Sequence, residues 1–350
     1  MKVVNQITET AFANPEEELI EIIGKDVLWS CTTCRACQEI CPAAIEHVPK
    51  IIDLRRSMVL MEGEFPGEEV MTAMEQTEVN GNPLGSGYAS RGDWAEELGI
   101  KTIDEESEVD VIYFVGCYGS FDKRNIRIAK SFVRLCQAAG IRVGILGKDE
   151  KCCGEPMRKM GNEYLYQSLA MENVEALQAS GVKKVVTTCP DCYNTLAKDY
   201  RDFDFNLEVE TYTVFLEGLI REGKLTIKPD QFTCTYHDSC YMGRHNDVYE
   251  PPRNLITAAG GTIVEMDKSR TEGFCCSAGG GRIMADETIG ERISVKRVQM
   301  AAATGAPELL SNCPFCLTMF EDGIKGADLE DQLKPKDIAE LLEERLETAA

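Results

Sequence analysis

Cysteine is the residue type that points most clearly to chemistry in this sequence. The chain of 350 residues contains 16 cysteines but only three histidines, so sulfur would supply most of any metal ligation. Disulfide scaffolds are rare in the reducing cytosol, and the sequence shows no export signal, so these cysteines favour metal or redox chemistry. All but Cys136 and Cys234, which we expect in the core, fall into three groups. The groups are Cys31, Cys34, Cys37 and Cys41; Cys117, Cys152, Cys153, Cys189 and Cys192; and Cys240, Cys275, Cys276, Cys313 and Cys316.

The first group has the spacing of a ferredoxin cluster motif. The pattern Cys-x2-Cys-x2-Cys-x3-Cys-Pro from Cys31 to Pro42, here named the ferredoxin-like run, matches the bacterial ferredoxin motif that ligates an iron-sulfur cube. A zinc site and a chance cluster are the alternatives, and the proline after four thiolates favours iron and sulfur. In ferredoxins with two clusters the fourth cysteine ligates the other cluster, and this sequence has no second run. Either Cys41 completes a lone cluster, or another chain supplies the missing half.

The other two groups, named the first and second five-cysteine sets, share one plan. Each consists of a single cysteine, an adjacent pair and a Cys-Pro-x-Cys, and these parts lie 34 to 36 residues apart. Structural zinc needs only four ligands, usually in pairs separated by a short loop, so zinc fits poorly. An adjacent pair suits a site with several irons, in which one sulfur bridges two metals.

The two sets belong to an internal repeat. A shift of 123 residues carries Cys117 onto Cys240, and a shift of 124 carries Cys189 onto Cys313. Both copies alternate β-branched runs with amphipathic stretches, which predicts an α/β fold of two duplicated domains with mainly parallel sheets. The expected strands are 109–115, 141–146, 182–188, 232–236, 262–266 and 308–310, and the expected helices are 125–139, 162–179, 252–259 and 286–303.

Every cysteine of a set follows the carboxyl end of an expected strand, where parallel sheets gather their ligands. Before the repeat, a small all-helical unit, with helices at 16–24 and 48–62, surrounds the ferredoxin-like run. The expected domains are 1–79 (helical unit), 80–108 (linker), 109–230 and 231–334 (the two repeats) and 335–350 (C-terminal helix). We expect the charged amphipathic stretch 335–346 to form a solvated cap.

These motifs resemble the paired CCG domains of heterodisulfide reductases, over the whole chain. With its helical unit the sequence is similar to the D-type chain of these enzymes, a fusion of B-type and C-type subunits, and to iron-sulfur oxidoreductases that serve electron-transfer flavoproteins, lactate or glycolate oxidation and quinone reduction. The resemblance implies one [4Fe-4S] cluster of ferredoxin type and two non-cubane [4Fe-4S] clusters, with a disulfide cleaved between the latter. Two departures are Ser277 in place of the CCG glycine, and one ferredoxin run where two are usual.

The implied site residues are the fourteen grouped cysteines as metal ligands, with Gly154 and Gly279 allowing the backbone to approach the cofactor closely. His237 lies three residues before Cys240, where a histidine could donate a proton to a reduced disulfide or hydrogen-bond a cluster sulfur. A hydrogen bond to a loop carbonyl is the structural alternative for this histidine.

The sequence therefore predicts a subunit that relays electrons from the ferredoxin-type cluster to two non-cubane clusters and reduces a small-molecule disulfide. The alternative is a non-catalytic relay between a flavoprotein and a quinone or other acceptor. A flavoprotein or another iron-sulfur subunit is an expected partner in both cases, because no flavin or nicotinamide motif is present. A membrane cytochrome or a quinone-linked protein is a further expected partner.

Charge and hydropathy exclude some partners. The formal net charge is −22, with 59 acidic against 37 basic side chains, so nucleic acid would be repelled. No apolar run approaches the roughly 20 residues that span a bilayer, so we expect a cytoplasmic protein, placed at the inner membrane face only through a partner.

Overall fold

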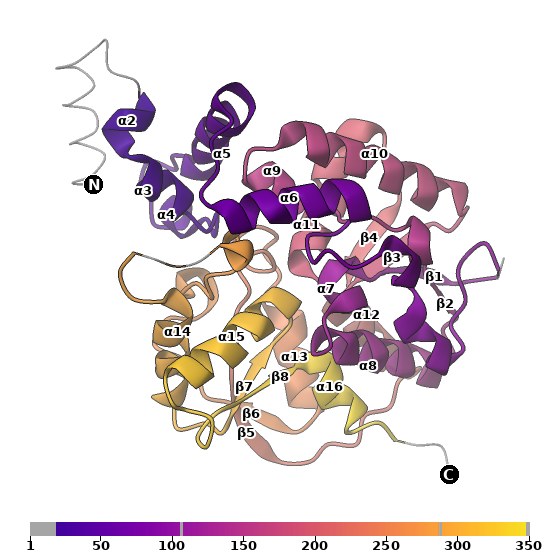
Figure 1. Cartoon of the computed structure of the whole chain (residues 1–350). Coiled ribbons are helices and arrows are strands. Elements are labelled where there is room, and N and C mark those ends of the chain that lie inside the picture. Colours follow the sequence, from indigo (N-terminus) through magenta and orange to yellow (C-terminus); the bar gives the residue numbers. More distant parts are fainter. Residues whose placement is uncertain (1–18, 106–107, 286, 288, 348–350) are drawn as a thin grey trace.

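Two parallel sheets form the body of the protein. The computed structural model describes residues 19–105, 108–285, 287 and 289–347. In that part of the chain one sheet has the strand order β2-β1-β3-β4 and the other the order β6-β5-β7-β8, with every pairing parallel. The identical order confirms the duplicated α/β fold, and Figure 1 shows the two sheets side by side with helices around them.

The first repeat follows the expected alternation of strands and helices. Its strands are β1 (Val111–Phe114), β2 (Val143–Gly144), β3 (Lys184–Thr187) and β4 (Glu208–Thr211). Its α-helices are α7 (Gly116–Phe121), α8 (Asn125–Ala138), α9 (Glu155–Lys159), α10 (Glu163–Ala179), α11 (Pro190–Ala197) and α12 (Tyr212–Arg221), with 3-10 turns η4 (Gly147–Asp149) and η5 (Asp199–Phe203).

The second repeat has the same strand order as the first but fewer helices. Its strands are β5 (Phe232–Tyr236), β6 (Gly261–Ile263), β7 (Glu308–Ser311) and β8 (Lys334–Asp337). Its helices are α13 (Glu250–Ala258), α14 (Ile293–Ala302), α15 (Pro314–Gly326) and α16 (Ile338–Glu343), with 3-10 turns η6 (Arg270–Glu272) and η7 (Arg282–Met284).

The N-terminal unit is helical, as expected, and lies against both repeats (Figure 1). Its elements are α2 (Leu19–Ile23), α3 (Lys25–Trp29), α4 (Ala36–Glu39), α5 (His47–Ser57), the π-helix η1 (Met58–Glu62) and α6 (Glu68–Asn80). The segment expected as a linker holds two 3-10 turns, η2 (Tyr88–Ser90) and η3 (Asp93–Leu98). The first residues of the expected helix 16–24 lie outside the described residues.

The prediction of a solvated helix at the C-terminal end of the chain was wrong in both secondary structure and solvent exposure. Residues 334–337 form strand β8, and only 338–343 are helical. Ile338, Leu341 and Leu342 are fully buried, so α16 packs into the core and is not a solvated cap. Strands β4 and β8 were missed because both lie at sheet edges and read as charged sequence, Glu-Val-Glu-Thr and Lys-Pro-Lys-Asp.

One apolar cluster joins the two repeats. It contains side chains from α8, α12, α13 and α16, and both Cys136 and Cys234 are fully buried in it, as expected. Arg124 adds a polar link, because its guanidinium donates to Glu321 and Glu340 of the second repeat. These contacts hold together the two repeats and the strand ends that carry their cysteines. Among the described residues, no helix is both long and apolar enough to cross a bilayer.

Candidate metal centres

The sheet topology brings each five-cysteine set to the carboxyl edge of its sheet. In the first repeat, Cys117 follows β1, the adjacent pair precedes α9, and Cys189 is the N-cap of α11 after β3. In the second repeat, Cys313 is the N-cap of α15 after β7. Pro190 and Pro314 start these two helices, where proline's fixed φ and missing N–H are tolerated. The Cys-Pro-x-Cys motif therefore places two sulfurs at a helix N-terminus, where the positive end of the dipole favours thiolate.

The sulfurs of the first set converge on Cys153. Its Sγ lies 3.4 Å from the Sγ of Cys192, and it accepts hydrogen bonds from the thiols of Cys152 and Cys192. These two bonds lower the pKa of Cys153. Cys117 in turn contacts Cys152, and Cys189 contacts Cys192, so the five sulfurs form one connected group.

The second set repeats this arrangement around Cys276. The Sγ atoms of Cys276 and Cys316 are 3.2 Å apart, and the thiols of Cys275 and Cys316 donate to Cys276, which lowers its pKa. In both sets the second cysteine of the adjacent pair thus touches two other sulfurs. That is the position expected of a sulfur that bridges metals.

The backbone beside each pair is also repeated. Gly154 has φ +83° and Ser277 has φ +91°, and the N–H of each lies near the sulfur two residues earlier, at 3.5 Å and 3.2 Å. A left-handed conformation costs a residue with a side chain roughly 1–2 kcal/mol, so the serine at this position is strained. The Ser277 hydroxyl donates to Glu287, which offsets part of that strain. The predicted glycine, Gly154, packs against Tyr166, where an added Cβ would come within 2.7 Å of the ring.

The ferredoxin-like run lies directly on the second set. The thiol of Cys275 lies close to that of Cys34 and raises its pKa, and the Cys275 Sγ lies 3.3 Å from the Thr32 hydroxyl. Arg244 donates to the Cys34 carbonyl at 2.7 Å, and a ring nitrogen of His245 lies 3.0 Å from the Thr33 carbonyl. Cys37 of the run is exposed.

Glycines make this close packing possible. A Cβ on Gly279 would lie 2.4 Å from the Thr32 carbonyl oxygen, and one on Gly280 would lie 2.6 Å from that of Cys31. Gly279, predicted to approach a cofactor, thus contacts the backbone of the ferredoxin-like run. Whether it also contacts a bound cluster stays a prediction.

Alanine at Gly279 is expected to push the ferredoxin-like run away from the second set. An overlap with backbone in a packed region costs about 1–3 kcal/mol, so the run should become more accessible to protease and the unfolding midpoint should fall. Limited proteolysis and denaturant titration measure both effects. Gly87→Ala is the matched control, because φ at Gly87 is negative and nothing lies within 4 Å of an added Cβ. Equal behaviour of the two variants would contradict the packing argument.

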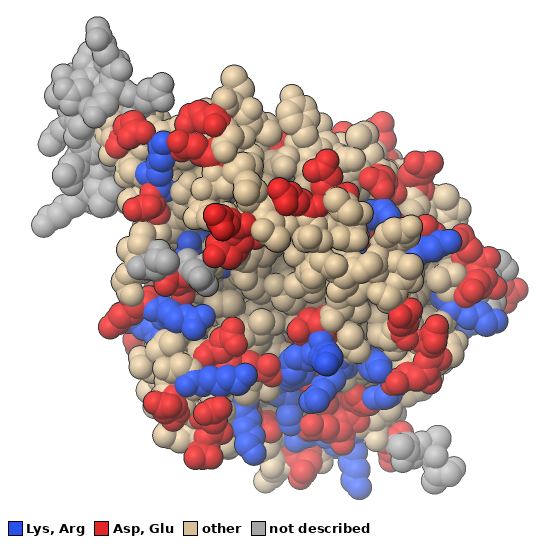
Figure 2. Space-filling view, in the orientation of Figure 1, with Lys and Arg blue, Asp and Glu red and all other residues tan. Residues whose placement is uncertain are grey.

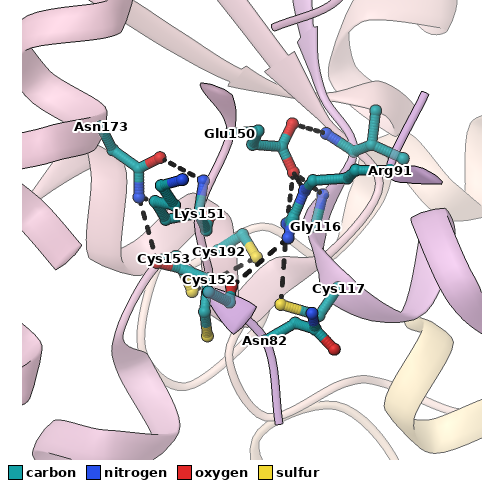
Figure 3. A network of polar contacts seen from close by, with 12 residues as sticks. Asn82, Arg91, Gly116, Cys117, Glu150, Lys151, Cys152, Cys153, Asn173 and Cys192 are labelled. Atoms are coloured by element: carbon teal, nitrogen blue, oxygen red, sulfur yellow. Dashed lines mark hydrogen bonds and ion pairs between the residues drawn. The ribbon is translucent and has the colours of Figure 1, made fainter. Parts of the chain in front are cut away.

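The segment expected to be a linker supplies a buried arginine to the first set, as Figure 3 shows. The Arg91 guanidinium lies 3.6 Å from the Cys117 Sγ and pairs with Glu150 at 2.7 Å, and both side chains are almost fully buried. Glu150 also accepts the backbone N–H groups of Val115 and Gly116, each at 2.9 Å. The pair fixes the chain that carries Cys117. Arg91 was not predicted from the sequence. The one hint of a role for it was a single basic residue next to a Gly-rich stretch.

Glutamine at Glu150 is expected to lower the free energy of unfolding by about 3 kcal/mol, because it leaves the buried Arg91 without its counter-charge. Asp110→Asn is the control, since Asp110 pairs with Arg142 at the surface, where such a pair contributes at most about 1 kcal/mol. Urea unfolding of both variants measures the difference. Similar losses would show that the buried pair is no more important than the exposed one.

Two acidic side chains lie in the space between the sets. Asp191 is 4% exposed, and its Oδ2 lies 4.0 Å from the Sγ of Cys189 in the first set and 3.8 Å from that of Cys313 in the second. Its Oδ1 and the Oε1 of Glu155, which is 2% exposed, have no hydrogen-bond partner. Burial raises the pKa of both carboxyls. The two sets therefore lie on either side of the Asp191 side chain.

His237 is close to the second set, as its sequence position suggested. One of its ring nitrogens lies within 4.8 Å of the sulfurs of Cys276 and Cys316, and Arg297 donates to its Nδ1 at 3.1 Å. Because Nδ1 accepts, the ring proton lies on Nε2. Burial and the Arg297 charge hold the pKa of His237 well below its usual value, so the ring is neutral near pH 7. Its role as proton donor remains a prediction.

The donor sets fit iron-sulfur clusters. Each five-cysteine set offers only thiols: those of the first set are all buried, and in the second set Cys240 and Cys275 are half-buried and the other three are buried. The ferredoxin-like run adds four more thiols around a turn. Thiolate-rich sites select iron-sulfur clusters or zinc, and five converging sulfurs exceed the four that a zinc ion takes. The fit therefore agrees with the chemistry that the spacing predicted.

Comparison with known proteins gives the same family. The CCG family, described as "Cysteine-rich domain", matches residues 111–197 and 234–321, which are the two repeats. The chain is 42% identical to the EtfAB:quinone oxidoreductase of Syntrophomonas wolfei over 97% of its own length, and 43% identical to a probable iron-sulfur-binding oxidoreductase of Bacillus subtilis over 92%. It is 32% identical to the D-type chain of the dihydromethanophenazine:CoB–CoM heterodisulfide reductase of Methanosarcina barkeri over 92% of its length.

The length of these relatives differs from that of this chain. The chain spans 50% of the Syntrophomonas protein and 47% of the Bacillus protein, so it covers about half of either. It spans 78% of the Methanosarcina protein.

Proposed function

Since this chain belongs to the CCG-domain iron-sulfur oxidoreductases that include the D-type chains of heterodisulfide reductases, we propose that it takes up single electrons at the ferredoxin-like run and delivers pairs of electrons to an acceptor at the five-cysteine sets. In this proposal Cys31, Cys34, Cys37 and Cys41 hold a [4Fe-4S] cluster. Each five-cysteine set holds a non-cubane [4Fe-4S] cluster. When bound, such clusters supply reversible one-electron storage at potentials tuned by their surroundings.

The contact between Cys34 and Cys275 carries this proposal. Because these two thiols are neighbours that perturb each other's pKa, the ferredoxin-like run adjoins the second set. The first set has no such contact with the run among the described residues, and it is linked to the second set through Asp191. The order of transfer proposed here is therefore ferredoxin-like run, second set, first set.

The chain's residues hold this path in place. Arg244 fixes the Cys34 carbonyl, and Gly279 lets the run approach the second set. Arg91 holds the strand end that carries Cys117. The first set, Asp191 and three cysteines of the second set are buried, so little water reaches these sulfurs, which strengthens the electrostatic interactions there.

Two acceptors are compatible with the arrangement. Disulfide reduction needs two electrons and a position for the disulfide between the two sets. Asp191 occupies such a position, because its Oδ2 lies near a sulfur of each set, and this favours disulfide reduction. A relay from a flavoprotein to a quinone-linked partner is favoured by the similarity to the EtfAB:quinone oxidoreductase. Exposed Cys37 is the side of the run that such a flavoprotein would reach.

Iron and acid-labile sulfide analysis of the reconstituted chain tests the proposal. Three clusters require about 12 iron atoms per chain. Electron paramagnetic resonance of stepwise reduced samples should show three separate signals, with that of the ferredoxin-like run appearing first after rapid mixing with reduced methyl viologen. About four iron atoms, or a zinc-containing colourless protein, would refute the assignment of the five-cysteine sets.

A further inference from the structure

A groove between the helical unit and the repeats is lined by charged and polar side chains. Its volume is about 420 Å³, which is large enough for a small molecule. The lining comes from the ferredoxin-like run and α5, from α9 and α11 of the first repeat, and from His245 of the second. Among the described residues no cysteine lines it, so the groove is separate from the space that the sulfurs of the five-cysteine sets share.

Three cations of this groove have no carboxylate partner. In the part of the chain that the structure describes, Arg35, Lys159 and Lys198 form no ion pair, although all three line the groove. The Arg35 guanidinium donates to the side-chain oxygen of Gln38 at 2.6 Å, and the Lys198 ammonium donates to the backbone carbonyl of His245 at 2.5 Å. Both acceptors are neutral, so the two positive charges stay unmatched.

Lys159 is the most buried of these cations, at 8% exposed. Its charge acts on Glu155 along α9, but burial raises the pKa of that carboxyl, and the two side chains form no ion pair. Burial and the charges of all three cations lower the pKa of His245 to about 3. The three positive charges therefore act on the same imidazole ring and lie around one part of the groove.

The acidic side chains of the groove do not neutralise these cations. Two of the three carboxylates among its described lining residues, Asp53 and Asp199, pair with arginines at 2.8 Å and 3.0 Å, and the third, Glu46, is exposed. The pKa of Lys198 is lowered by burial and then by the Arg35 charge, and the opposing effect of Asp199 is smaller. A positive field therefore remains in this part of the groove.

Two buried donors of the groove also lack an acceptor. They are the Nε2 of Gln38 and the Nε of Arg56, and the Oδ2 of Asp199 is an acceptor without a donor. Buried polar groups in proteins are almost always hydrogen-bonded, so two unpartnered N–H groups beside three cations indicate a ligand rich in acceptor oxygens. One protonated oxygen on that ligand would satisfy Asp199.

Another concentration of basic side chains shows what this groove lacks. On the face seen in Figure 2, basic side chains gather near α8 and α16 with acidic ones among them. Arg134 of α8 pairs there with Glu343 of α16 at 2.7 Å. The whole chain has a formal net charge of −22, so carboxylates are plentiful, and three cations without one are unusual in it.

We propose that the groove at Arg35, Lys159 and Lys198 binds a small molecule with two or more negative charges, carried by phosphate or carboxylate groups. Guanidinium and ammonium groups hold such oxygens through charge-assisted hydrogen bonds. Because Arg35 belongs to the ferredoxin-like run and Lys198 follows α11, the ligand joins the helical unit to the first repeat. No cysteine takes part, so this inference is independent of the proposed function.

Isothermal titration calorimetry of the reconstituted full chain tests the site. Inorganic phosphate and succinate at pH 8 are the dianionic probes, and succinamide is the neutral probe of the same size as succinate, all at one ionic strength. We expect at least one dianion to bind at one saturable site, at least about tenfold more tightly than succinamide. Saturation by phosphate alone or by succinate alone would support the site and assign its anionic group. Saturable binding of neither dianion, or equal binding of succinamide, would overturn the inference.

A lysine substitution locates the binding. Lys198→Gln removes one exposed cation of the groove and should weaken binding of the dianion by about tenfold. Lys325→Gln is the matched control, because Lys325 is an exposed lysine of α15 that does not line the groove, and its affinity should stay unchanged. Unchanged affinity in Lys198→Gln, or equal weakening in both variants, would overturn the inference. Iron content should be the same in both variants, which separates this test from that of the proposed clusters.

Discussion

Serine at Cys275 is expected to stop electron transfer out of the ferredoxin-like run while the run itself stays reducible. Cys275 touches Cys34 of the run, the Thr32 hydroxyl and Cys276 of its own set, so it stands at the junction between the two groups of sulfurs. A serine oxygen is a poor ligand for iron, and loss of a ligand exceeds the 10–100-fold effect of removing an outer-shell partner. Turnover with any acceptor should fall by more than about 100-fold.

The corresponding change in the first set separates the two halves of the path. Cys152→Ser removes the equivalent sulfur of the first set, so turnover should fall as far. In the part of the chain that the structure describes, the thiols that interact with Cys152 are Cys117 and Cys153 of its own set. In this variant, however, the second set should still be reduced through the run. Rapid-freeze electron paramagnetic resonance distinguishes the variants by which signals appear. Cys136→Ser is the control, because Cys136 is buried in the core away from both sets and its loss should leave the iron content unchanged.

Retained turnover in both Cys152→Ser and Cys275→Ser would refute disulfide reduction by the paired sets. Retained turnover in Cys275→Ser alone would show that electrons reach the first set without the second. The order proposed from the contact between Cys34 and Cys275 would then be wrong.

The duplicated fold could be predicted because its signals are local. Strand Phe232–Tyr236 was predicted at its observed bounds, and helices α8 and α10 within one residue, because their apolar residues keep a regular period over their whole length. β2 is only two residues long where six were expected, because it pairs with β1 only through Val143 and Gly144, and Ile145 instead forms a bridge with Thr102. The predicted helix 286–303 is observed from Ile293, and residues 286 and 288 lie outside the described residues.

The parts that could not be predicted depend on contacts between distant residues. The sequence places Cys34 and Cys275 about 240 residues apart, and no local pattern shows that they touch. Arg91 and Glu150 are likewise ordinary charged residues until the fold buries them together. The edge strands β4 and β8 form because a neighbouring strand offers its free backbone groups, so tertiary pairing overrides weak β-propensity there.

Arg55 holds the helical unit on the two repeats, and alanine in its place is expected to detach that unit. The side chain is completely buried, and its guanidinium donates to carbonyl oxygens of the run and of both repeats. The acceptors are Leu28, Trp29 and Cys31 in the helical unit, Lys159 in the first repeat and Gly280 in the second. Burial lowers the pKa of Arg55 to about 10, so the group stays charged at neutral pH.

Removal of this side chain leaves buried carbonyl oxygens without donors, each at a cost of about 1–3 kcal/mol, and opens a cavity. We therefore expect Arg55→Ala to lower the free energy of unfolding by about 4–5 kcal/mol, measured by urea titration. If the helical unit detaches while the repeats stay folded, protease should cleave near residues 63–67 before the repeats unfold. Arg56→Ala is the matched control, because Arg56 is the next residue of α5 and pairs with Asp53 and Glu163 near the surface. A loss in Arg55→Ala no larger than in Arg56→Ala would mean that the run is held on the second set by other contacts, with Gly279 and Arg244 the first to examine.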